Sequence, residues 1–171
     1  MNKRNVIVIS TIFLLIVSVL ISLKMKEQST IAQKEIIKKA EIILVDGTYE
    51  ILLNKEIFEQ SGVEKFSATL DTASTEPTKH NYTGVQLKNI IKSYVDLEAK
   101  TTVILSAADG YSVAYSIDEI TKEGNVFIAF MEDDKYLGGM EDGGRGPYES
   151  IVVSDMFSNR RCKWITKIEV K

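Results

Sequence analysis

The 171-residue sequence contains only one cysteine, one histidine, one tryptophan and two prolines. A single cysteine excludes an internal disulfide and a zinc site built from cysteines, and a single histidine excludes a His-rich metal site. The sequence also lacks an excess of basic residues, because 21 Lys and Arg stand against 24 Asp and Glu, a formal net charge of −3. Nucleic acid binding needs a basic face, so we expect no nucleic-acid partner.

The longest hydrophobic run lies near the N-terminus. Val6 to Leu23 spans 18 residues without a charge and follows Lys3 and Arg4. A helix that rises about 1.5 Å per residue nearly crosses the roughly 30 Å hydrocarbon layer of a bilayer over this length. We interpret residues 1–23 as a transmembrane anchor, with a signal sequence as the alternative, and no A-x-A-like cleavage site follows the run. The basic flank predicts a single-pass protein of the cell membrane whose domain lies outside the cytoplasm.

Residues 24–40 are rich in lysine, and Glu35 and Lys39 have the spacing of a helical ion pair. We expect a solvated helical stalk that contributes nothing to a core. Residues 41–171 then have the length of one ordinary domain. Two Asp-Gly pairs within it, Asp46-Gly47 and Asp109-Gly110, lie between strand-like segments and predict tight hairpins.

Capping signals predict three helices in this domain. Asn54 precedes the segment KEIFEQ, and Thr83 and Ser116 are each followed three residues later by Gln or Glu, which is the spacing of a capping box. Asp71 to Asn81 is rich in turn formers and contains a proline, so we expect a loop there. The last segment, from Lys163, alternates as a strand whose expected common face carries Trp164, Thr166, Ile168 and Val170.

The expected strands and helices do not alternate regularly along the chain. Strand-like segments dominate, and the helical segments are short. This pattern predicts an α+β domain with mixed, mainly antiparallel sheets.

Four motifs, in their order along the chain, resemble the molybdopterin-binding domain of the sulfite oxidase family. They are Tyr82 to Leu87 (YTGVQL), Ala107 to Tyr111 (AADGY), the glycine-rich loop and strand from Gly143 to Ser154, and a closing strand with Trp164, Ile168 and Val170. The resemblance covers Ile42 to Val170. It implies a mixed fold with helices packed around sheets, in agreement with the pattern of strands and helices.

The family resemblance also implies a molybdenum site, from which this sequence departs. Family members hold the metal through the pterin dithiolene and through one cysteine thiolate, whose place here is Leu70 to Ala73, a stretch without cysteine. The arginine that helps to hold the anionic cofactor corresponds to the neighbourhood of Glu149, where the charge is reversed. Ser154 stands where the family often has proline.

These departures favour a non-catalytic binding or interaction module, with no metal and no cofactor expected, whose partner is a small anionic ligand or a protein. The alternative is an extracytoplasmic oxidoreductase that holds molybdopterin in an altered site. In either case, the residues that match or flank the motifs define a candidate pocket of Asp71, His80, Asp109, Tyr111 and Arg145.

The histidine, the cysteine and three arginines have two possible roles each. His80 is either a pocket residue or a solvated loop histidine beside Lys79 and Asn81. Cys162 is either a thiol activated by the basic residues around it or an inert residue facing inward from the last strand, and we favour the inert role because free cysteine is usually buried. Arg145, Arg160 and Arg161 either bind an anion or solubilise the surface.

Overall fold

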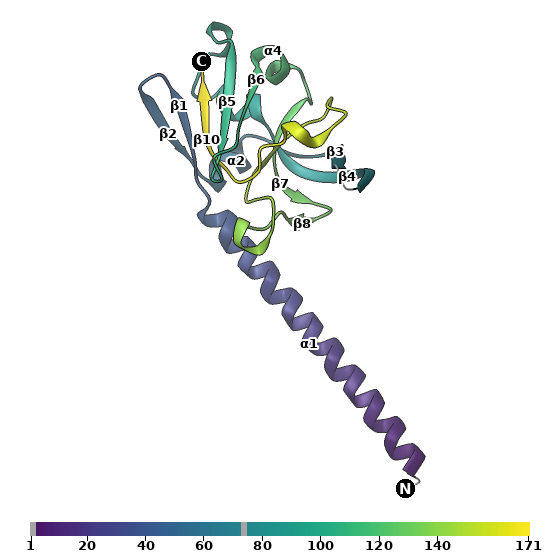
Figure 1. Ribbon diagram of the computed structural model, residues 1–171. Helices are drawn as coiled ribbons and strands as arrows, with labels where there is room; N and C mark the ends of the chain where they lie inside the picture. Colours follow the sequence, from purple (N-terminus) through teal and green to yellow (C-terminus); the bar gives the residue numbers. More distant parts are fainter. Residues whose placement is uncertain (1–2, 73–74) are drawn as a thin grey trace.

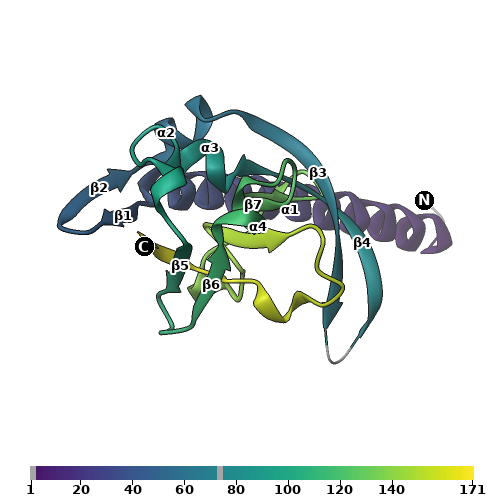
Figure 2. The same cartoon turned by 90° about the horizontal axis from the view of Figure 1, so that it is seen from above.

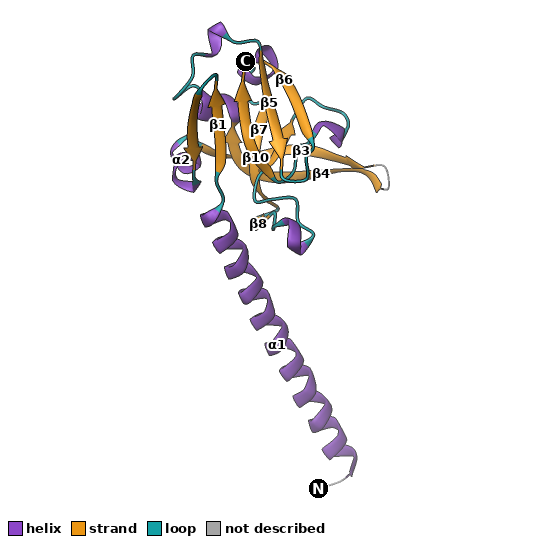
Figure 3. Ribbon diagram, turned by 60° about the vertical axis from the view of Figure 1, so that its left-hand side comes forward, coloured by secondary structure: helices purple, strands orange, loops and turns teal. Residues whose placement is uncertain are grey.

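The computed structural model describes residues 3–72 and 75–171 (Figure 1). One long helix, α1 (Lys3–Lys39), extends away from a domain that is built mainly of strands. The domain contains two five-stranded sheets, and its helices are short (Figure 3). The prediction of an α+β domain with mainly antiparallel pairing is therefore confirmed.

The first sheet has the strand order β2-β1-β10-β5-β6. Only its β1/β10 pair is parallel, since the other three neighbouring pairs are antiparallel. Both predicted Asp-Gly hairpins lie in this sheet, one joining β1 to β2 and the other joining β5 to β6. The strands are β1 (Ile42–Asp46), β2 (Tyr49–Leu53), β5 (Thr102–Ala107), β6 (Ser112–Ser116) and β10 (Ile165–Val170).

The second sheet has the order β3-β4-β7-β8, with β9 also paired to β7, and every pair in it is antiparallel. Its strand β7 begins with four consecutive buried residues, as expected for a strand covered on both faces. The strands are β3 (Val63–Thr72), β4 (Thr75–Gln86), β7 (Val126–Glu132), β8 (Lys135–Tyr136) and β9 (Glu149–Val152).

Short helices connect the strands, and two of the three predicted caps are present. The Asn54 side chain accepts a hydrogen bond from the Ile57 N–H at 3.2 Å, and Ser116 forms the reciprocal capping box with Glu119. The helices are α2 (Lys55–Gln60), α3 (Leu87–Ile91) and α4 (Ile117–Thr121), with 3₁₀ turns η1 (Leu97–Ala99), η2 (Met140–Asp142) and η3 (Ser158–Arg160).

The third predicted cap is wrong, because Thr83 to Gln86 belong to strand β4 and α3 begins only at Leu87. Tertiary packing overrides the local signal here. A Cβ atom at Gly84 would lie 2.4 Å from the Ile128 carbonyl oxygen, so the backbones of β4 and β7 approach too closely for any other residue.

The predicted loop at Asp71 to Asn81 is also wrong, since β3 continues to Thr72 and β4 begins at Thr75; residues 73 and 74 lie outside the described residues. Pro77 is tolerated in β4 because β4 pairs with β7 only from Tyr82 onward. Its missing N–H therefore costs no hydrogen bond on that side. The two strands form a long ribbon that arches away from the core (Figure 2).

The face predicted for the last strand requires a correction. Ile165, Ile168 and Val170 are buried and Thr166 is exposed, because the pairing of β10 with β5 shifts register between Ile165 and Lys167. A bulge of this kind changes which residues point inward on either side of it. Ile168 and Val170 therefore share the core face with Ile165 rather than with Thr166.

The C-terminal end of α1 is not fully solvated, which corrects the prediction that the stalk contributes nothing to a core. Ile37 is 3% exposed and belongs to the hydrophobic core, and Ala40 packs against it. Within the described part of the chain, no helix is long and apolar enough to cross a membrane. The predicted run from Val6 to Leu23 lies partly outside the described side chains, which begin at Ser10.

Candidate functional site

A cleft of about 730 Å³ opens between the end of β3, the segment around η3 and the residues that lead into β9 and β10. The β3–β4 ribbon reaches η3, where the backbone N–H of Asp71 donates a hydrogen bond to the Ser158 hydroxyl at 2.9 Å. This contact holds one wall of the cleft in place. The charged side chains that line the cleft, together with the Ser158 hydroxyl, are Asp71, Glu132, Arg145, Glu149, Arg161 and Lys163.

Glu149 is the most unusual residue of the cleft. Its side chain is 0% exposed, and neither carboxylate oxygen has a hydrogen-bond partner. The nearest charge is the guanidinium of Arg145, whose Nη1 lies 3.6 Å from Oε2 of Glu149. Burial raises the pKa of Glu149, and the positive charges of Arg145, Arg161 and Lys163 offset only part of this effect.

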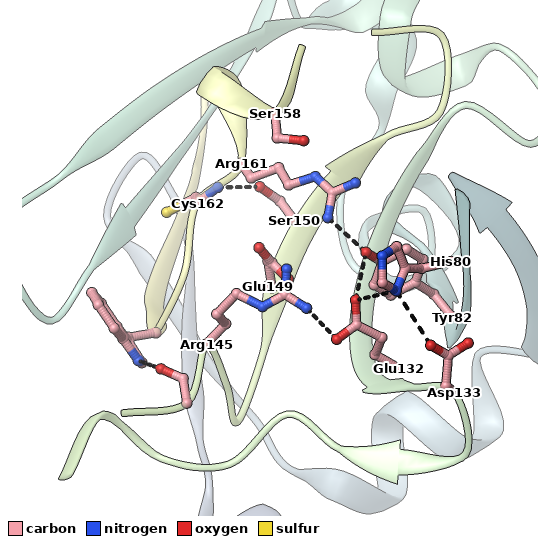
Figure 4. A network of polar contacts seen from close by, with 12 residues as sticks. His80, Tyr82, Glu132, Asp133, Arg145, Glu149, Ser150, Ser158, Arg161 and Cys162 are labelled. Atoms are coloured by element: carbon pink, nitrogen blue, oxygen red, sulfur yellow. Dashed lines mark hydrogen bonds and ion pairs between the residues drawn. The ribbon is translucent and has the colours of Figure 1, made fainter. Parts of the chain in front are cut away.

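Arg145 is shared between two carboxylates. Its Nη2 lies 2.5 Å from Oε2 of Glu132, which is a closer ion pair than the one with Glu149 (Figure 4). The two acidic groups raise the pKa of Arg145 despite its burial, so the guanidinium stays charged. One positive charge is thus shared between two carboxylates on this side of the cleft.

Arg161 is buried on the opposite wall at 9% exposure and makes only neutral contacts. Its guanidinium donates hydrogen bonds to the Tyr82 hydroxyl at 3.0 Å and to the Thr69 carbonyl oxygen at 2.7 Å, and it also lies over the Tyr82 ring at 5.2 Å. Lys163 lies 6.0 Å from the Trp164 ring. Among the described residues, no carboxylate forms an ion pair with Arg161 or Lys163.

The structure brings two of the predicted pocket residues, Asp71 and Arg145, into this cleft. Tyr111 reaches its edge, because the hydroxyl donates a hydrogen bond to the backbone oxygen of the cleft residue Asn159 at 3.1 Å. Asp109 does not line the cleft, since its carboxylate accepts the Tyr111 backbone N–H at 2.9 Å within the hairpin turn. The predicted role of Asp71, Asp109, Tyr111 and Arg145 in ligand binding stays a prediction.

His80 lies on strand β4 and not on a solvated loop, which corrects that alternative. Its Nδ1 is 3.2 Å from carboxylate oxygens of both Glu132 and Asp133, and its Nε2 is 2.8 Å from the Thr78 hydroxyl. It borders a neighbouring cavity of about 410 Å³ that shares Glu132 and Arg145 with the main cleft. His80 therefore contacts the charge network from outside the cleft.

Glu149, Arg161 and Lys163 were not among the predicted pocket residues. The family resemblance identified Glu149 only as a charge reversal, and Arg161 was one of three arginines with an anion-binding alternative. Arg160, its neighbour, instead forms ion pairs with Glu119 and Asp155. The sequence carries no signal that one of two adjacent arginines is buried, because burial here depends on contact with the distant β3–β4 ribbon.

Cys162 is buried, as we favoured, but it precedes β10 and does not face inward from that strand. It is 0% exposed, and burial raises the pKa of its thiol to about 12, so the reactive thiolate is disfavoured. Its backbone N–H donates a hydrogen bond to the Ser150 hydroxyl at 2.9 Å, which fixes its place between β9 and β10.

The cleft does not fit the thiolate-held molybdenum group that the family resemblance implies. The end of β3 offers the carboxylate of Asp71, and Ala73 lies outside the described residues but carries no thiol. The one thiol of the chain does not line the cleft. The carboxylate of Glu149 is also buried where the resemblance implies a basic group. No cluster of three or more metal-ligating His, Cys, Asp or Glu side chains occurs among the described residues.

No protein-family model matches the chain, and no curated protein matches it either. Among solved structures, the chain is similar to the crystal structure of the sulfane dehydrogenase SoxCD from Paracoccus pantotrophus, with a TM-score of 0.64 and 12% sequence identity. The match covers 78% of this chain but only 38% of the SoxCD chain. At this identity the similarity shows a shared α+β fold alone.

Proposed function

We propose that this protein is a membrane-anchored, extracytoplasmic binding module with a sulfite oxidase-like fold, which binds a small anion and is not catalytic. The observation that carries the proposal is the cleft itself. It has a basic wall of Arg161 and Lys163, for which no carboxylate partner occurs in the described part of the chain, and at the end of β3 it has Asp71 in place of a thiolate.

Two independent lines support the fold assignment. Four motifs occur in the family's order between Tyr82 and Val170, and the structure is similar to a sulfane dehydrogenase over 78% of the chain. Neither line carries a catalytic role to this chain, because one fold hosts many functions.

The basic wall supports an anionic ligand. A buried guanidinium that lacks an opposite charge is costly, and a bound anion would supply that charge. Arg161 is held in place by Tyr82 and Thr69, so its orientation is set before a ligand arrives. Lys163 lines the same cleft and adds a further hydrogen-bond donor.

The exposed apolar surface of α1 supports anchoring in a membrane. Nine large apolar side chains of this helix are between 52% and 66% exposed, and nothing in the domain covers them. A continuous apolar surface of this kind is unfavourable in water and favourable in a bilayer. These residues are Ile12, Phe13, Leu14, Leu15, Ile16, Val19, Leu20, Ile21 and Leu23.

The alternative function is that of an extracytoplasmic oxidoreductase with molybdopterin in an altered site. One observation favours it: a cleft of about 730 Å³ falls within the usual size range of cofactor pockets. The loss of the thiolate and the buried carboxylate of Glu149 favour the binding module instead.

Elemental analysis and native mass spectrometry of the full chain, purified in detergent from molybdate-supplied native cells, distinguish the two functions. The binding module is expected to contain no stoichiometric molybdenum. About one molybdenum per chain would refute it and favour the oxidoreductase.

Fractionation of the same cells tests the location. The full chain is expected in the membrane fraction, with Lys171 accessible to protease added outside intact cells. Recovery in the soluble fraction would refute the anchor, and protection of Lys171 would reverse the topology.

A further inference from the structure

We propose that anion binding in the cleft is coupled to the uptake of one proton by Glu149. This inference rests on the proposed anion-binding function and adds a regulation to the same site. Its starting point is geometric: Glu149 lines the cleft, is fully buried, and has no hydrogen-bond partner for either carboxylate oxygen.

The charges around Glu149 come from every element that packs near it. Arg145 precedes β9, Arg161 and Lys163 precede β10, Glu132 ends β7, and Asp71 lies near the end of β3. Tyr82 on β4 and Cys162 are neutral neighbours, because burial raises the pKa of each. His80 contacts Glu132 but does not line the cleft.

Arg145 does not hold Glu149 in its ionised form unaided, because its closer partner is Glu132 at 2.5 Å. The remaining positive charges that favour ionised Glu149 are those of Arg161 and Lys163, which act at longer range. These are also the two cations without a carboxylate partner, and hence the groups that attract an anion.

An anion bound at Arg161 and Lys163 therefore neutralises two of the three positive charges that favour ionised Glu149 and leaves only Arg145, which Glu132 also engages. It also adds a negative charge near the fully buried carboxylate of Glu149, where repulsion between like charges is strong. Protonation removes this repulsion and gives Glu149 an O–H group that can donate a hydrogen bond. The balance of the step is one anion bound and one proton taken from solvent, with no bond formed or broken in the ligand.

Linkage then fixes the direction of the pH dependence. If binding takes up one proton, affinity falls by up to about tenfold for each pH unit above the pKa of Glu149 in the free protein. Affinity levels off below that pKa, because Glu149 is then already protonated.

Calorimetric titration of the full chain with sulfate, in neutral detergent at constant ionic strength, tests the coupling. Sulfate keeps the same charge over the range of about pH 5 to 8, so any proton exchanged belongs to the protein. Parallel titrations in two buffers with different ionisation enthalpies count the protons. We expect uptake of up to one proton per sulfate and an infrared band of a protonated carboxylic acid that appears on binding.

Matched variants assign the proton to its residue. Glu149→Gln keeps the size of the side chain and cannot be ionised, so its affinity is expected to be independent of pH and to lose the buffer-dependent heat. Lys163→Gln is expected to weaken binding at every pH. His80→Gln is expected to keep the coupling, because His80 lies outside the cleft.

The outcomes separate the two proposals. Sulfate binding without proton uptake at any pH between about 5 and 8 in the wild-type protein would overturn the coupling and leave the anion site standing, and this result needs no variant to fold. Unchanged pH dependence in a folded Glu149→Gln variant would also overturn it. Failure of both the wild-type protein and Glu149→Gln to bind sulfate at any pH would overturn the anion site, and the coupling with it.

Discussion

The buried carboxylate of Glu149 should make the stability of the protein fall as pH rises, even without a ligand. We predict that Glu149→Gln removes this loss. The wild-type residue is fully buried without hydrogen bonds, and burial raises its pKa above the ordinary Glu value of 4.5. Its ionisation is therefore easier in the unfolded chain than in the folded one.

The direction and the magnitude of this change in the free energy of unfolding follow from proton linkage. The stabilisation from this group is fully present below about pH 4.5, its ordinary value, and is lost as pH rises through the raised pKa of the folded state. Between those two values the unfolded chain has released the proton and the folded chain still holds it. The free energy of unfolding then falls by about 1.4 kcal/mol per pH unit from this residue alone.

Urea denaturation of both proteins across this pH range, in buffers free of sulfate and phosphate, measures the difference. The free energy of unfolding of Glu149→Gln minus that of the wild-type protein should increase with pH and then level off. Glu119→Gln is the matched control: burial raises the pKa of Glu119, but the Ser116 cap and Arg160 together lower it by more, so the difference between this variant and the wild-type protein should be flat above about pH 4.5 and change in the opposite direction below it. A pH-independent difference for Glu149→Gln would refute the reasoning.

Three further substitutions test the fold by thermal or urea unfolding. Gly84→Ala should destabilise by about 1–3 kcal/mol or more, because its Cβ would lie 2.4 Å from the Ile128 carbonyl oxygen; wild-type stability would contradict the close approach of β4 and β7. Ile37→Ala should cost about 2–5 kcal/mol, whereas Ile31→Ala at 55% exposure should cost little; equal effects would remove the end of α1 from the core. Gly110→Val should cost about 1–3 kcal/mol from backbone strain at φ +88° alone, and no loss of stability would contradict the turn geometry.

Local signals predicted those parts of the fold where a few adjacent residues decide the structure. The Asp46-Gly47 and Asp109-Gly110 hairpins and the Asn54 and Ser116 caps depend on contacts within about four residues, so the sequence shows them directly. Thr83 has the same capping signal as Ser116 but lies in a strand. The difference comes from β7, more than forty residues away along the chain, which pairs with β4 at Gly84.

The site was less predictable than the fold, for a physical reason. Asp71 and Arg145 followed from the order of the family motifs, and both line the cleft. The buried state of Glu149 and Arg161 did not follow, because charged residues beside turns are usually solvated. Arg161 is covered because β3 and β4 offer it the Thr69 carbonyl and the Tyr82 hydroxyl, contacts that lie 92 and 79 residues away along the chain.

The net charge of the cleft links the proposed anion binding to the protonation of Glu149. With every group ionised, Arg145, Arg161 and Lys163 face Asp71, Glu132 and Glu149, so the positive and negative charges balance and the cleft as a whole does not attract an anion. Protonation of Glu149 leaves one positive charge of the cleft uncompensated. It lies near Arg161 and Lys163, for which no carboxylate partner occurs among the described residues. An anion that arrives there meets a favourable field and a new hydrogen-bond donor at once. If the proposed anion site is correct, the carboxylate of Glu149 makes the affinity of the cleft for anions depend on pH, which a permanently basic cleft would not do.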